Sequence, residues 1–389
     1  MRLACVVQRY GPEITGGSEA HCRHLAERLA AGHQVDVLTS CASDYLHWRN
    51  TLPAGWSTAG PVRLRRFEVA RPRRMSAFVE LSHRAFGRRR TPDDEREWFR
   101  ANGPEVPGLL DYLQAHGADY DLVLFWAFRY FPSYFGVPIV SNRAVLVPTA
   151  EDDAVLDFTT VPAFLRLPRG YLFLTDEERA LVTARAGGLD VPSAVIGTGL
   201  EPAIDRPASV LDELGLTDPF VVYVGRVDRN KGCEALVNDF ARYVAEVGRE
   251  VTLVLAGPVH IPMPSHPRIR VLGRVSDAVR DALFERARAL VMPSPYESLC
   301  MALLEAWNHA LPAIVNGHCA VLRGQVQRSN GGLHYGTSRE FAAALSWVLE
   351  HPDLARQLGR QGLAYVEAEY RWPTVLSRVE RLLGELLGG

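Results

Sequence analysis

The chain has 389 residues, a length that suggests two or three domains, and its formal net charge of −2 provides no global field to attract nucleic acid. Hydrophobic residues make up 47% of it, which is normal for a globular protein with full cores. The six cysteines are scattered without a Cys-x-x-Cys pair, which indicates reduced thiols and excludes an obvious disulfide framework or zinc site. No apolar run reaches the ~18 residues of a membrane span, and the reduced thiols lead us to expect a cytoplasmic protein.

The first half of the chain alternates strand and helix patterns. Residues 3–8 form a short apolar run typical of a buried strand, and residues 18–31 carry apolar positions at helical spacing before Gly32. Further strands are expected at 34–40, 120–127, 144–150 and 170–176. This alternation predicts a doubly wound α/β domain with a mostly parallel sheet.

A second alternating set begins at 220–226. It continues with strands expected at 251–257, 269–275, 289–294 and 312–317. The segment 197–219, rich in Pro, Gly and Asp, is the expected join, and 374–387 reads as one amphipathic helix. The predicted fold class is therefore α/β, with two doubly wound Rossmann-like domains, 1–198 and 199–371, facing across a cleft.

Two glycines open the first predicted helix. Gly16 and Gly17 follow the first strand, on the side of the sheet where open α/β folds bind ligands. They would let the backbone approach a ligand, and the helix N-terminus would offer N–H groups to an anion. An ordinary tight turn uses the same residues, and both interpretations stay open.

The motif GRVDRNKG, residues 225–232, holds Lys231, the only lysine among 43 basic residues. Together with Arg226 it lies directly after a predicted strand, where a diphosphate would bind. A guanidinium grips two oxygens at once, whereas an ammonium is a compact point charge that arginine does not imitate. The alternative is two solvated basic residues in a loop.

The third motif is PYESLCMALLEAW, residues 295–307. Glu297 stands at the start of an expected helix and Glu305 eight positions later, about 12 Å along the axis. That separation is too long for an acid–base carboxylate pair, which needs about 5–9 Å, but it suits two contacts to one elongated ligand. Backbone N–H groups between them could cap a phosphate, and a buried Glu305 would require a partner. A solvated helix face is the alternative.

Together, in this order and along nearly the whole chain, the three motifs resemble the retaining family 4 (group 1) glycosyltransferases of the GT-B fold. Each motif alone is unspecific. The resemblance implies that domain 1–198 is the acceptor side and that domain 199–371 binds the nucleotide-sugar donor. It also implies that the last helix, 372–389, crosses back onto the first domain.

The resemblance assigns roles to single residues. Arg226 and Lys231 would hold the donor diphosphate, and with Glu297 they form the predicted catalytic set. Glu305 would bind ribose hydroxyls, Glu297 the hydroxyls of the transferred sugar, and Gly17 would pack against the phosphate or sugar from the other domain. The complete predicted donor site consists of Gly16, Gly17, Arg226, Lys231, Glu297, Ser298, Leu299, Cys300 and Glu305.

Two departures from the family pattern matter. The family usually has E-G-F-G where this chain has ESLC, so Ser298 and Cys300 replace glycines. Many relatives carry a His-Asp pair after a strand of the first domain, where this chain has Glu151 and Asp152 followed by Asp153. These acids could contact sugar or acceptor, mark lost activity, or form a plain acidic loop.

The segment 63–90 carries ten arginines against two glutamates, with four apolar residues, Phe67, Met75, Phe78 and Phe86, interleaved. Such a patch could dock on anionic lipid headgroups at the inner membrane face or hold a phosphorylated acceptor. A solvated insertion would have the same composition. Nothing else in the sequence supports binding of nucleic acid.

The predicted function is retaining transfer of a hexose from a nucleoside-diphosphate sugar to a hydroxyl acceptor, a sugar, a lipid-linked molecule or a small molecule. Polysaccharide, glycolipid or glycoconjugate synthesis would use it. Because Arg226 and Lys231 would stabilise the leaving diphosphate, no metal or cofactor is expected. The alternatives are a catalytically weak sugar-nucleotide-binding protein and an epimerase or hydrolase on the same fold.

Overall fold

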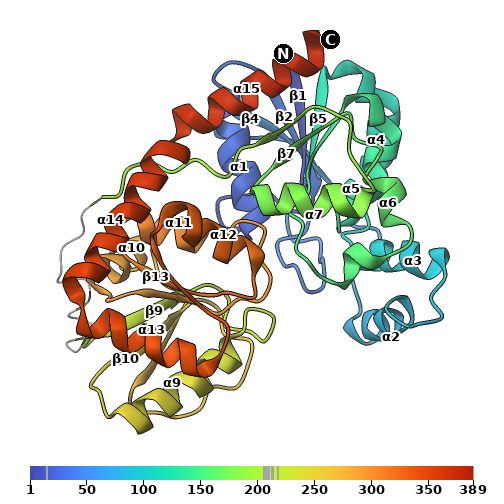
Figure 1. Ribbon diagram of the computed structural model, residues 1–389. Helices are drawn as coiled ribbons and strands as arrows, with labels where there is room; N and C mark the ends of the chain where they lie inside the picture. The colour runs from blue at the N-terminus through green and yellow to red at the C-terminus, as the bar shows by residue number, and fades with distance from the viewer. Residues whose placement is uncertain (15, 205–210, 212–213, 217–218, 389) are drawn as a thin grey trace. The chain divides into compact units, whose positions relative to one another are not determined.

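The computed structural model describes residues 1–14, 16–204, 211, 214–216 and 219–388, so part of the predicted join 197–219 lies outside the described residues. The chain divides into two compact units. One is Met1–Gly199 with Val375–Gly389, and the other is Leu200–Thr374. Each unit contains one sheet covered by helices (Figure 1).

The first unit is built on an eight-stranded sheet with the order β3-β4-β2-β1-β5-β6-β7-β8. All neighbouring strands are parallel except the edge pair β3–β4. The strands are β1 (Arg2–Val6), β2 (Gln34–Ser40), β3 (Gly55–Ala59), β4 (Val62–Phe67), β5 (Leu122–Trp126), β6 (Ala144–Val147), β7 (Gly170–Phe173) and β8 (Ser193–Val195).

The helices of the first unit connect these strands. They are α1 (Gly17–Leu29), α2 (Met75–Ala85), α3 (Pro92–Asn102), α4 (Pro107–His116), α5 (Phe131–Gly136), α6 (Val161–Phe164) and α7 (Asp176–Ala186), with short 3-10 turns η1 (Gly117–Asp119), η2 (Val137–Arg143) and η3 (Ala154–Asp157). Strands β1, β5 and β6 are almost wholly inaccessible to solvent because helices cover both faces of a parallel sheet.

The second unit has a six-stranded, wholly parallel sheet with the order β11-β10-β9-β12-β13-β14. Its strands are β9 (Phe220–Val224), β10 (Thr252–Ala256), β11 (Ile269–Gly273), β12 (Leu290–Met292), β13 (Ala313–Asn316) and β14 (Gly332–Tyr335). Its helices are α9 (Cys233–Val247), α10 (Asp277–Arg286), α11 (Met301–Asn308), α12 (Ala320–Ser329), α13 (Ser338–Glu350) and α14 (Pro352–Glu369). This strand order is the doubly wound Rossmann order, which confirms the predicted α/β fold class.

The last helix, α15 (Trp372–Gly388), belongs to the first unit from Val375 onward. Its buried side chains recur at helical spacing, at Val375, Val379, Leu382, Leu383 and Leu386. His33 Nε2 lies 2.8 Å from Glu380 on its surface. Among the described residues, no helix is both long and apolar enough to cross a membrane.

Strands β3 and β4 correct one prediction. The arginine-rich segment 63–90 is not one surface, because its first residues are strand β4, paired to β2. Val62 and Leu64 point into the core on one face, and Arg63 and Arg65 alternate with them on the other face, where Phe67 lies against Arg65. Only the part from Arg71 onward surrounds α2, so the segment divides into two separate basic surfaces.

Candidate functional site

The strand order of the second unit places its candidate site. The chain leaves β9 toward β10 on one side, and β12 lies against β9 on the other side. Loops after β9 and β12 therefore begin at the point where crossovers diverge, which is where open α/β sheets bind ligands. These loops, 225–232 and 293–300, contain most of the predicted site residues.

Gly232 holds these two loops in close contact. It caps α9 with φ 72°, a left-handed backbone that favours glycine. A Cβ atom added at Gly232 would lie 2.6 Å from the carbonyl oxygen of Pro293, the first residue after β12. Asn316 Nδ2 donates to the same carbonyl at 3.0 Å. The backbones can therefore approach this closely only with glycine at position 232.

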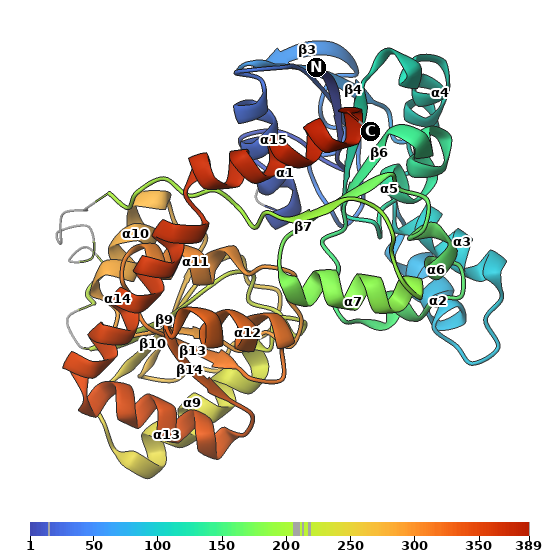
Figure 2. The ribbon, with the colours of Figure 1, turned by 45° about the horizontal axis from the view of Figure 1, so that its top comes forward.

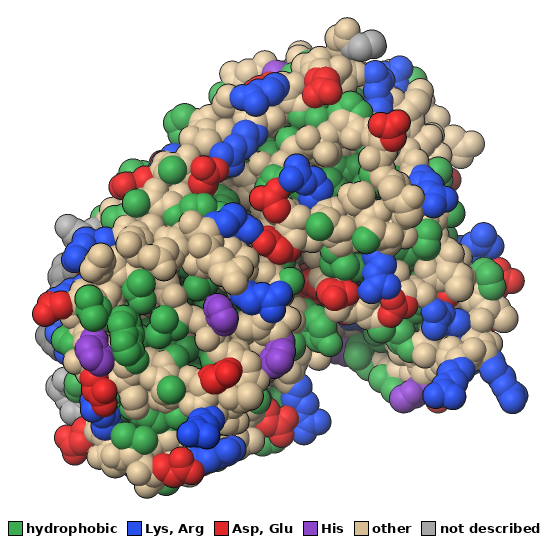
Figure 3. Space-filling view, viewed as in Figure 1, with side chains coloured by type: hydrophobic (Ala, Val, Ile, Leu, Met, Phe, Trp, Pro, Cys, Tyr) green, Lys and Arg blue, Asp and Glu red, His purple; other side chains and the backbone are tan. Residues whose placement is uncertain are grey.

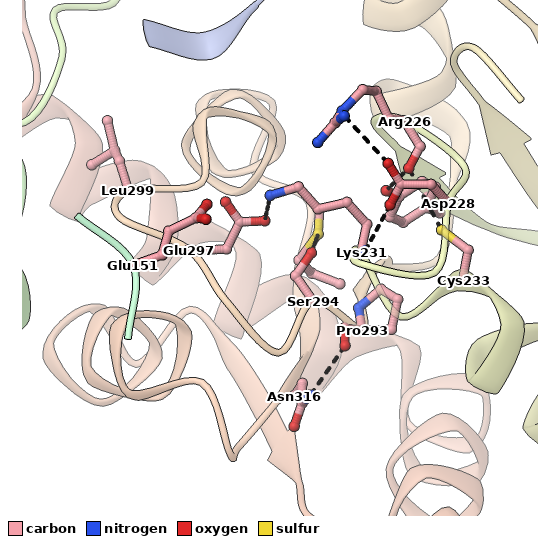
Figure 4. Close-up of polar contacts among 12 residues, drawn as sticks. Glu151, Arg226, Asp228, Lys231, Cys233, Pro293, Ser294, Glu297, Leu299 and Asn316 are labelled. Carbon is pink, nitrogen blue, oxygen red and sulfur yellow. Dashed lines mark hydrogen bonds and ion pairs between the residues drawn. The ribbon is translucent and has the colours of Figure 1, made fainter. Parts of the chain in front are cut away.

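Asp228 organises the loop after β9, and sequence reasoning missed it. Its Oδ1 accepts a hydrogen bond from the Lys231 backbone N–H at 2.8 Å, and its Oδ2 lies 3.4 Å from Arg226 Nη1 (Figure 4). The Arg226 carbonyl accepts from the Tyr223 hydroxyl at 2.7 Å, so the backbone of Arg226 is fixed as well. An aspartate three residues before the lysine in a turn was the available signal.

The central contact of the site joins two predicted residues. Lys231 Nζ donates to Glu297 Oε1 at 2.7 Å, and the two side chains are only 20% and 12% exposed. Figure 4 shows the ammonium and the carboxylate pointing toward one another from their separate loops. The structure thus brings together an ammonium and a carboxylate, with Arg226 on the same loop as the ammonium. That set can contact an anion and a hydroxyl-bearing group side by side.

The prediction that a helix starts at Glu297–Ser298 is wrong. Helix α11 begins at Met301, and Cys300 precedes it with φ 67° in the left-handed region. This backbone turn, together with a hydrogen bond from the Gln325 side-chain amide to the Leu299 carbonyl, holds residues 298–300 in a loop. Leu299 and Cys300 are buried. The resembled family has glycine where Cys300 stands, and a side chain in this conformation costs roughly 1–2 kcal/mol.

Glu305 lies in α11 and has the partner that its burial requires. Its Oε1 is 3.7 Å from Arg280 Nη1, and Arg280 also pairs with Asp277 at 3.0 Å and Asp281 at 3.4 Å. Burial raises the pKa of Glu305, and the charge of Arg280 opposes that rise. Burial would lower the pKa of Arg280, but its three carboxylate neighbours outweigh burial and raise it. Glu305 is therefore held in an ion-pair network between α10 and α11.

In the first unit, Gly16 caps α1 and Gly17 is its first residue. A Cβ atom at Gly16 would lie 2.0 Å from Glu19 Oε2, whereas one at Gly17 would meet nothing within 4 Å. Glu19 is buried and accepts from Arg9 Nη2 at 2.6 Å. A side chain at Gly16 would displace the Glu19 carboxylate that pairs with Arg9, and the space beside Gly17 is open to a ligand. Arg9 is a nearby cation that sequence reasoning missed.

The acidic loop after β6 is compensated by arginines. Arg129 Nη2 lies 2.8 Å from Asp153 and 3.7 Å from Glu151, and Arg185 Nη2 lies 3.2 Å from Asp152. Burial would lower the pKa of Arg129, but the carboxylates of Asp153 and Glu151 raise it overall. Glu151 and Asp152 therefore belong to different ion pairs.

Glu178 in α7 holds the start of this loop through hydrogen bonds to its backbone. Its carboxylate is buried and accepts from the N–H groups of Ala150 and Leu174, both at 2.6 Å. Burial raises the pKa of Glu178 to about 8, although the two N–H donors lower it and the Glu151 charge adds to the rise. Sequence reasoning missed this residue, because a glutamate among acidic neighbours gives no signal that it is buried.

We expect Glu178 to make the protein less stable as pH rises. Its folded-state pKa of about 8 lies above the value of 4.5 usual for a free glutamate, so the unfolded chain loses this proton at lower pH. The stabilisation is complete below pH 4.5 and is lost as pH rises to about 8, at a cost of about 5 kcal/mol. Urea unfolding at several pH values should show this slope in the wild type and a flatter one in Glu178→Gln. Equal slopes would contradict the assignment.

Comparison with known proteins identifies a domain that contains the Lys231–Glu297 pair. Residues 218–351 match the family described as glycosyl transferases group 1. Among curated proteins, the chain is 26% identical over 419 residues to a glycogen synthase of Mycobacterium tuberculosis, covering 96% of this chain and 92% of that protein. It is 25% identical over 421 residues to an alpha-maltose-1-phosphate synthase of Mycolicibacterium smegmatis, covering 96% of both.

Solved structures show the same fold. Sucrose-phosphate synthase from Thermosynechococcus elongatus superposes with a TM-score of 0.74 at 20% identity and full coverage of both chains. Anabaena HepE in complex with UDP-glucose superposes with a TM-score of 0.69 at 14% identity, again over both whole chains. The predicted enzyme class, a glycosyltransferase, is confirmed by the domain match and these relatives.

Proposed function

We propose that this protein transfers a hexose from a nucleoside-diphosphate sugar to a hydroxyl acceptor with retention of the anomeric configuration. The observation that carries the proposal is the contact of Lys231 with Glu297 at 2.7 Å at the switch point of a Rossmann-like sheet. Retention rests on the resemblance to a retaining family. Transfer into a polysaccharide, glycolipid or glycoconjugate suits relatives that are named synthases of glycogen and of a maltose phosphate.

The two charges of the central pair separate when the donor binds. The diphosphate attracts the Lys231 ammonium and the Arg226 guanidinium, and Glu297 then accepts hydrogen bonds from sugar hydroxyls. As the glycosidic bond breaks, the leaving diphosphate gains negative charge, which both cations stabilise more than they stabilise the ground state. In this proposal the cations replace a metal ion, and the reaction needs no cofactor.

Other residues complete the proposed donor site. Glu305, held by Arg280, binds the ribose hydroxyls, and the backbone of Ser298, Leu299 and Cys300 lines the donor ahead of α11. In the first unit, Gly17 offers a close approach to phosphate or sugar. Glu151 and Asp152 are the proposed contacts to a sugar or acceptor hydroxyl.

A donor screen tests the proposal. UDP-, GDP-, ADP- and dTDP-glucose are titrated calorimetrically and then incubated with the enzyme, and the anomer first released is identified by proton NMR. UDP-glucose heads the screen because HepE was solved in complex with it. Slow release of the retained anomer from one donor supports the proposal. Binding without turnover indicates a sugar-nucleotide-binding protein, an epimerised sugar nucleotide indicates an epimerase, and the inverted anomer excludes retention.

The side chains around α2 suit peripheral contact with an anionic membrane. Met75, Val79 and Phe86 are 36%, 48% and 38% exposed, and with Phe78 they line an open groove. Arg74 and Arg88 are exposed at the two ends of the helix. Figure 3 shows such basic and hydrophobic side chains next to one another at the lower right, over α2. Apolar side chains flanked by arginines suit the interface of an anionic bilayer.

Vesicle co-sedimentation tests this contact. We expect binding to vesicles that contain phosphatidylglycerol but not to pure phosphatidylcholine, with about tenfold less binding for Val79→Asp. High salt should release the protein, because the arginines contribute electrostatically. Equal binding to neutral and anionic vesicles, or wild-type binding by Val79→Asp, would contradict the proposal.

A further inference from the structure

Apart from the groove around α2, the first unit contains an open surface cavity, and none of the residues proposed to contact donor or acceptor lines it. It has a volume of about 670 Å³. It is formed by the edge hairpin β3–β4, the first residue of β1 and the end of α4. Its lining residues are Arg2, Trp56, Ser57, Thr58, Arg63, Arg65, Tyr112, His116 and Asp119.

This cavity lies away from the catalytic end of its sheet. Arg2 begins β1, and Arg63 is the second residue of β4, so both stand at the amino ends of parallel strands. Gly17 follows the carboxyl end of β1, about 15 Å further along a five-residue strand. Figure 2 shows β3 at the top of the first unit, beside the N-terminus. A ligand bound here cannot be the one bound beside Gly17.

Arginines and aromatic rings alternate around the cavity. The Arg65 guanidinium carbon lies 4.3 Å from the centroid of Tyr112 and 5.4 Å from that of Trp56. Arg63 lies 4.8 Å from the Trp56 centroid. A guanidinium stacked on a ring keeps its N–H edge directed outward, and it loses little entropy when that edge binds an oxyanion.

One arginine is fixed by a buried carboxylate and another is not. Arg63 donates to both oxygens of buried Asp36, at 2.7 and 2.8 Å, and Arg2 lies 3.8 Å from the same carboxylate. Within the described part of the chain, no carboxylate pairs with Arg65, which is held only by ring contacts. Arg65 is therefore the lining cation with an unmatched charge.

The mixture of lining groups defines the ligand chemistry. Trp56 is 46% exposed and gives an aromatic surface of the kind that stacks on the apolar face of a sugar ring. Ser57 and Thr58 carry hydroxyls and Asp119 a carboxylate, groups that hydrogen-bond to sugar hydroxyls. The three lining arginines outnumber the two nearby carboxylates, Asp36 and Asp119, so the net charge of the cavity is slightly positive. That charge suits one oxyanion and disfavours a polyanion such as nucleic acid.

We propose that this cavity binds a saccharide carrying one oxyanion, a phosphate or a carboxylate, at a site separate from the transfer centre. Arg65 holds the oxyanion with Arg63 beside it, and the exposed ring of Trp56 packs against the sugar ring. The cavity is open to solvent and has room for a monosaccharide. The inference does not depend on the proposed function, because no residue of the donor site lines the cavity.

Calorimetric titration of the full chain tests the site with four probes, glucose 6-phosphate, glucuronate, glucose and inorganic phosphate. We expect glucose 6-phosphate or glucuronate to bind with a Kd of about 1 mM or lower, and the better of the two identifies the oxyanion. Glucose and phosphate alone should bind at least about tenfold more weakly, since each makes half of the contacts. Binding of phosphate as tight as that of glucose 6-phosphate, or no binding by either anionic sugar, overturns the proposal.

Two variants locate the binding. Arg65→Met keeps an apolar stem beside Tyr112 and should weaken binding of the anionic sugar by about tenfold or more, as should Trp56→Phe to a smaller extent. Arg88→Met, an exposed arginine near α2, is the matched control and should bind like the wild type. Donor hydrolysis should be unchanged in Arg65→Met, so failure of this site is distinguishable from failure of the transferase proposal. Wild-type affinity in Arg65→Met overturns the assignment.

Discussion

Replacing Lys231 with alanine is expected to lower kcat/KM for the donor by about 100-fold or more, because it removes a cation from the leaving diphosphate. It also leaves Glu297, which is only 12% exposed, without its 2.7 Å partner. The unpaired carboxylate would then repel the donor phosphates. Donor hydrolysis kinetics measure the effect, and thermal melting shows whether the variant is folded.

The substitution Lys231→Arg tests whether the shape of the cation matters in addition to its positive charge. A planar guanidinium keeps the charge but does not fit a position made for a compact ammonium, so we expect about a tenfold loss. Arg229→Ala is the matched control, since that side chain lies on the same loop as Lys231, is 75% exposed and pairs with Glu234 at the start of α9. It should behave like the wild type. If Lys231→Arg also behaves like the wild type, the only lysine of the chain has no special role.

Gly232→Ala is expected to destabilise the second unit by about 3 kcal/mol, in the upper range for single substitutions. The left-handed backbone, φ 72°, costs roughly 1–2 kcal/mol with a side chain. The new Cβ would lie 2.6 Å from the Pro293 carbonyl oxygen, so the loop before α9 must move. Calorimetry should show the melting temperature of this unit lower by about 6–12 °C. Donor turnover should fall as well, because Lys231 precedes the displaced residue.

The other end of the same helix provides the control for Gly232→Ala. Gly248 caps the C-terminus of α9 with φ 66°, and a Cβ atom there would meet nothing within 4 Å. Gly248→Ala therefore has the backbone cost without the collision, about 1 kcal/mol or a few degrees in melting temperature. If Gly232→Ala and Gly248→Ala have the same melting temperature, the contact with Pro293 does not hold the loops in place.

Local pattern located the elements of this protein well. The strand expected at 34–40 is β2, Gln34–Ser40, a short segment whose apolar residues Val35, Val37 and Leu38 are typical of a buried strand. The order of strands and helices along the chain then predicted two Rossmann-like units. Alternating strands and helices with right-handed crossovers permit few other arrangements. Lys231 and Glu297 were both predicted as site residues, because each lies in a loop that follows a strand of the second sheet, and the structure places their side chains in contact.

Boundaries set by a single backbone angle were less predictable. The helix expected from Glu297 begins at Met301, because Cys300 adopts a left-handed conformation that its side chain disfavours. Packing around Cys300 imposes its φ angle, and scales of residue propensity do not include the effect of such packing. The arginine-rich segment 63–90 was likewise read as one patch, although pairing with β2 draws its first residues into a sheet.

The sequence by itself determined the fold class, the order of the elements and the two loops that carry Lys231 and Glu297, since these depend on local periodicity and on residue types beside strands. Only the tertiary structure decided which charges meet. Lys231 and Glu297 are 66 positions apart, and Asp36 reaches Tyr120 across 84. Whether a charge is paired, buried or exposed depends on such distant neighbours, because desolvation and Coulomb energy follow position in space and not separation along the chain.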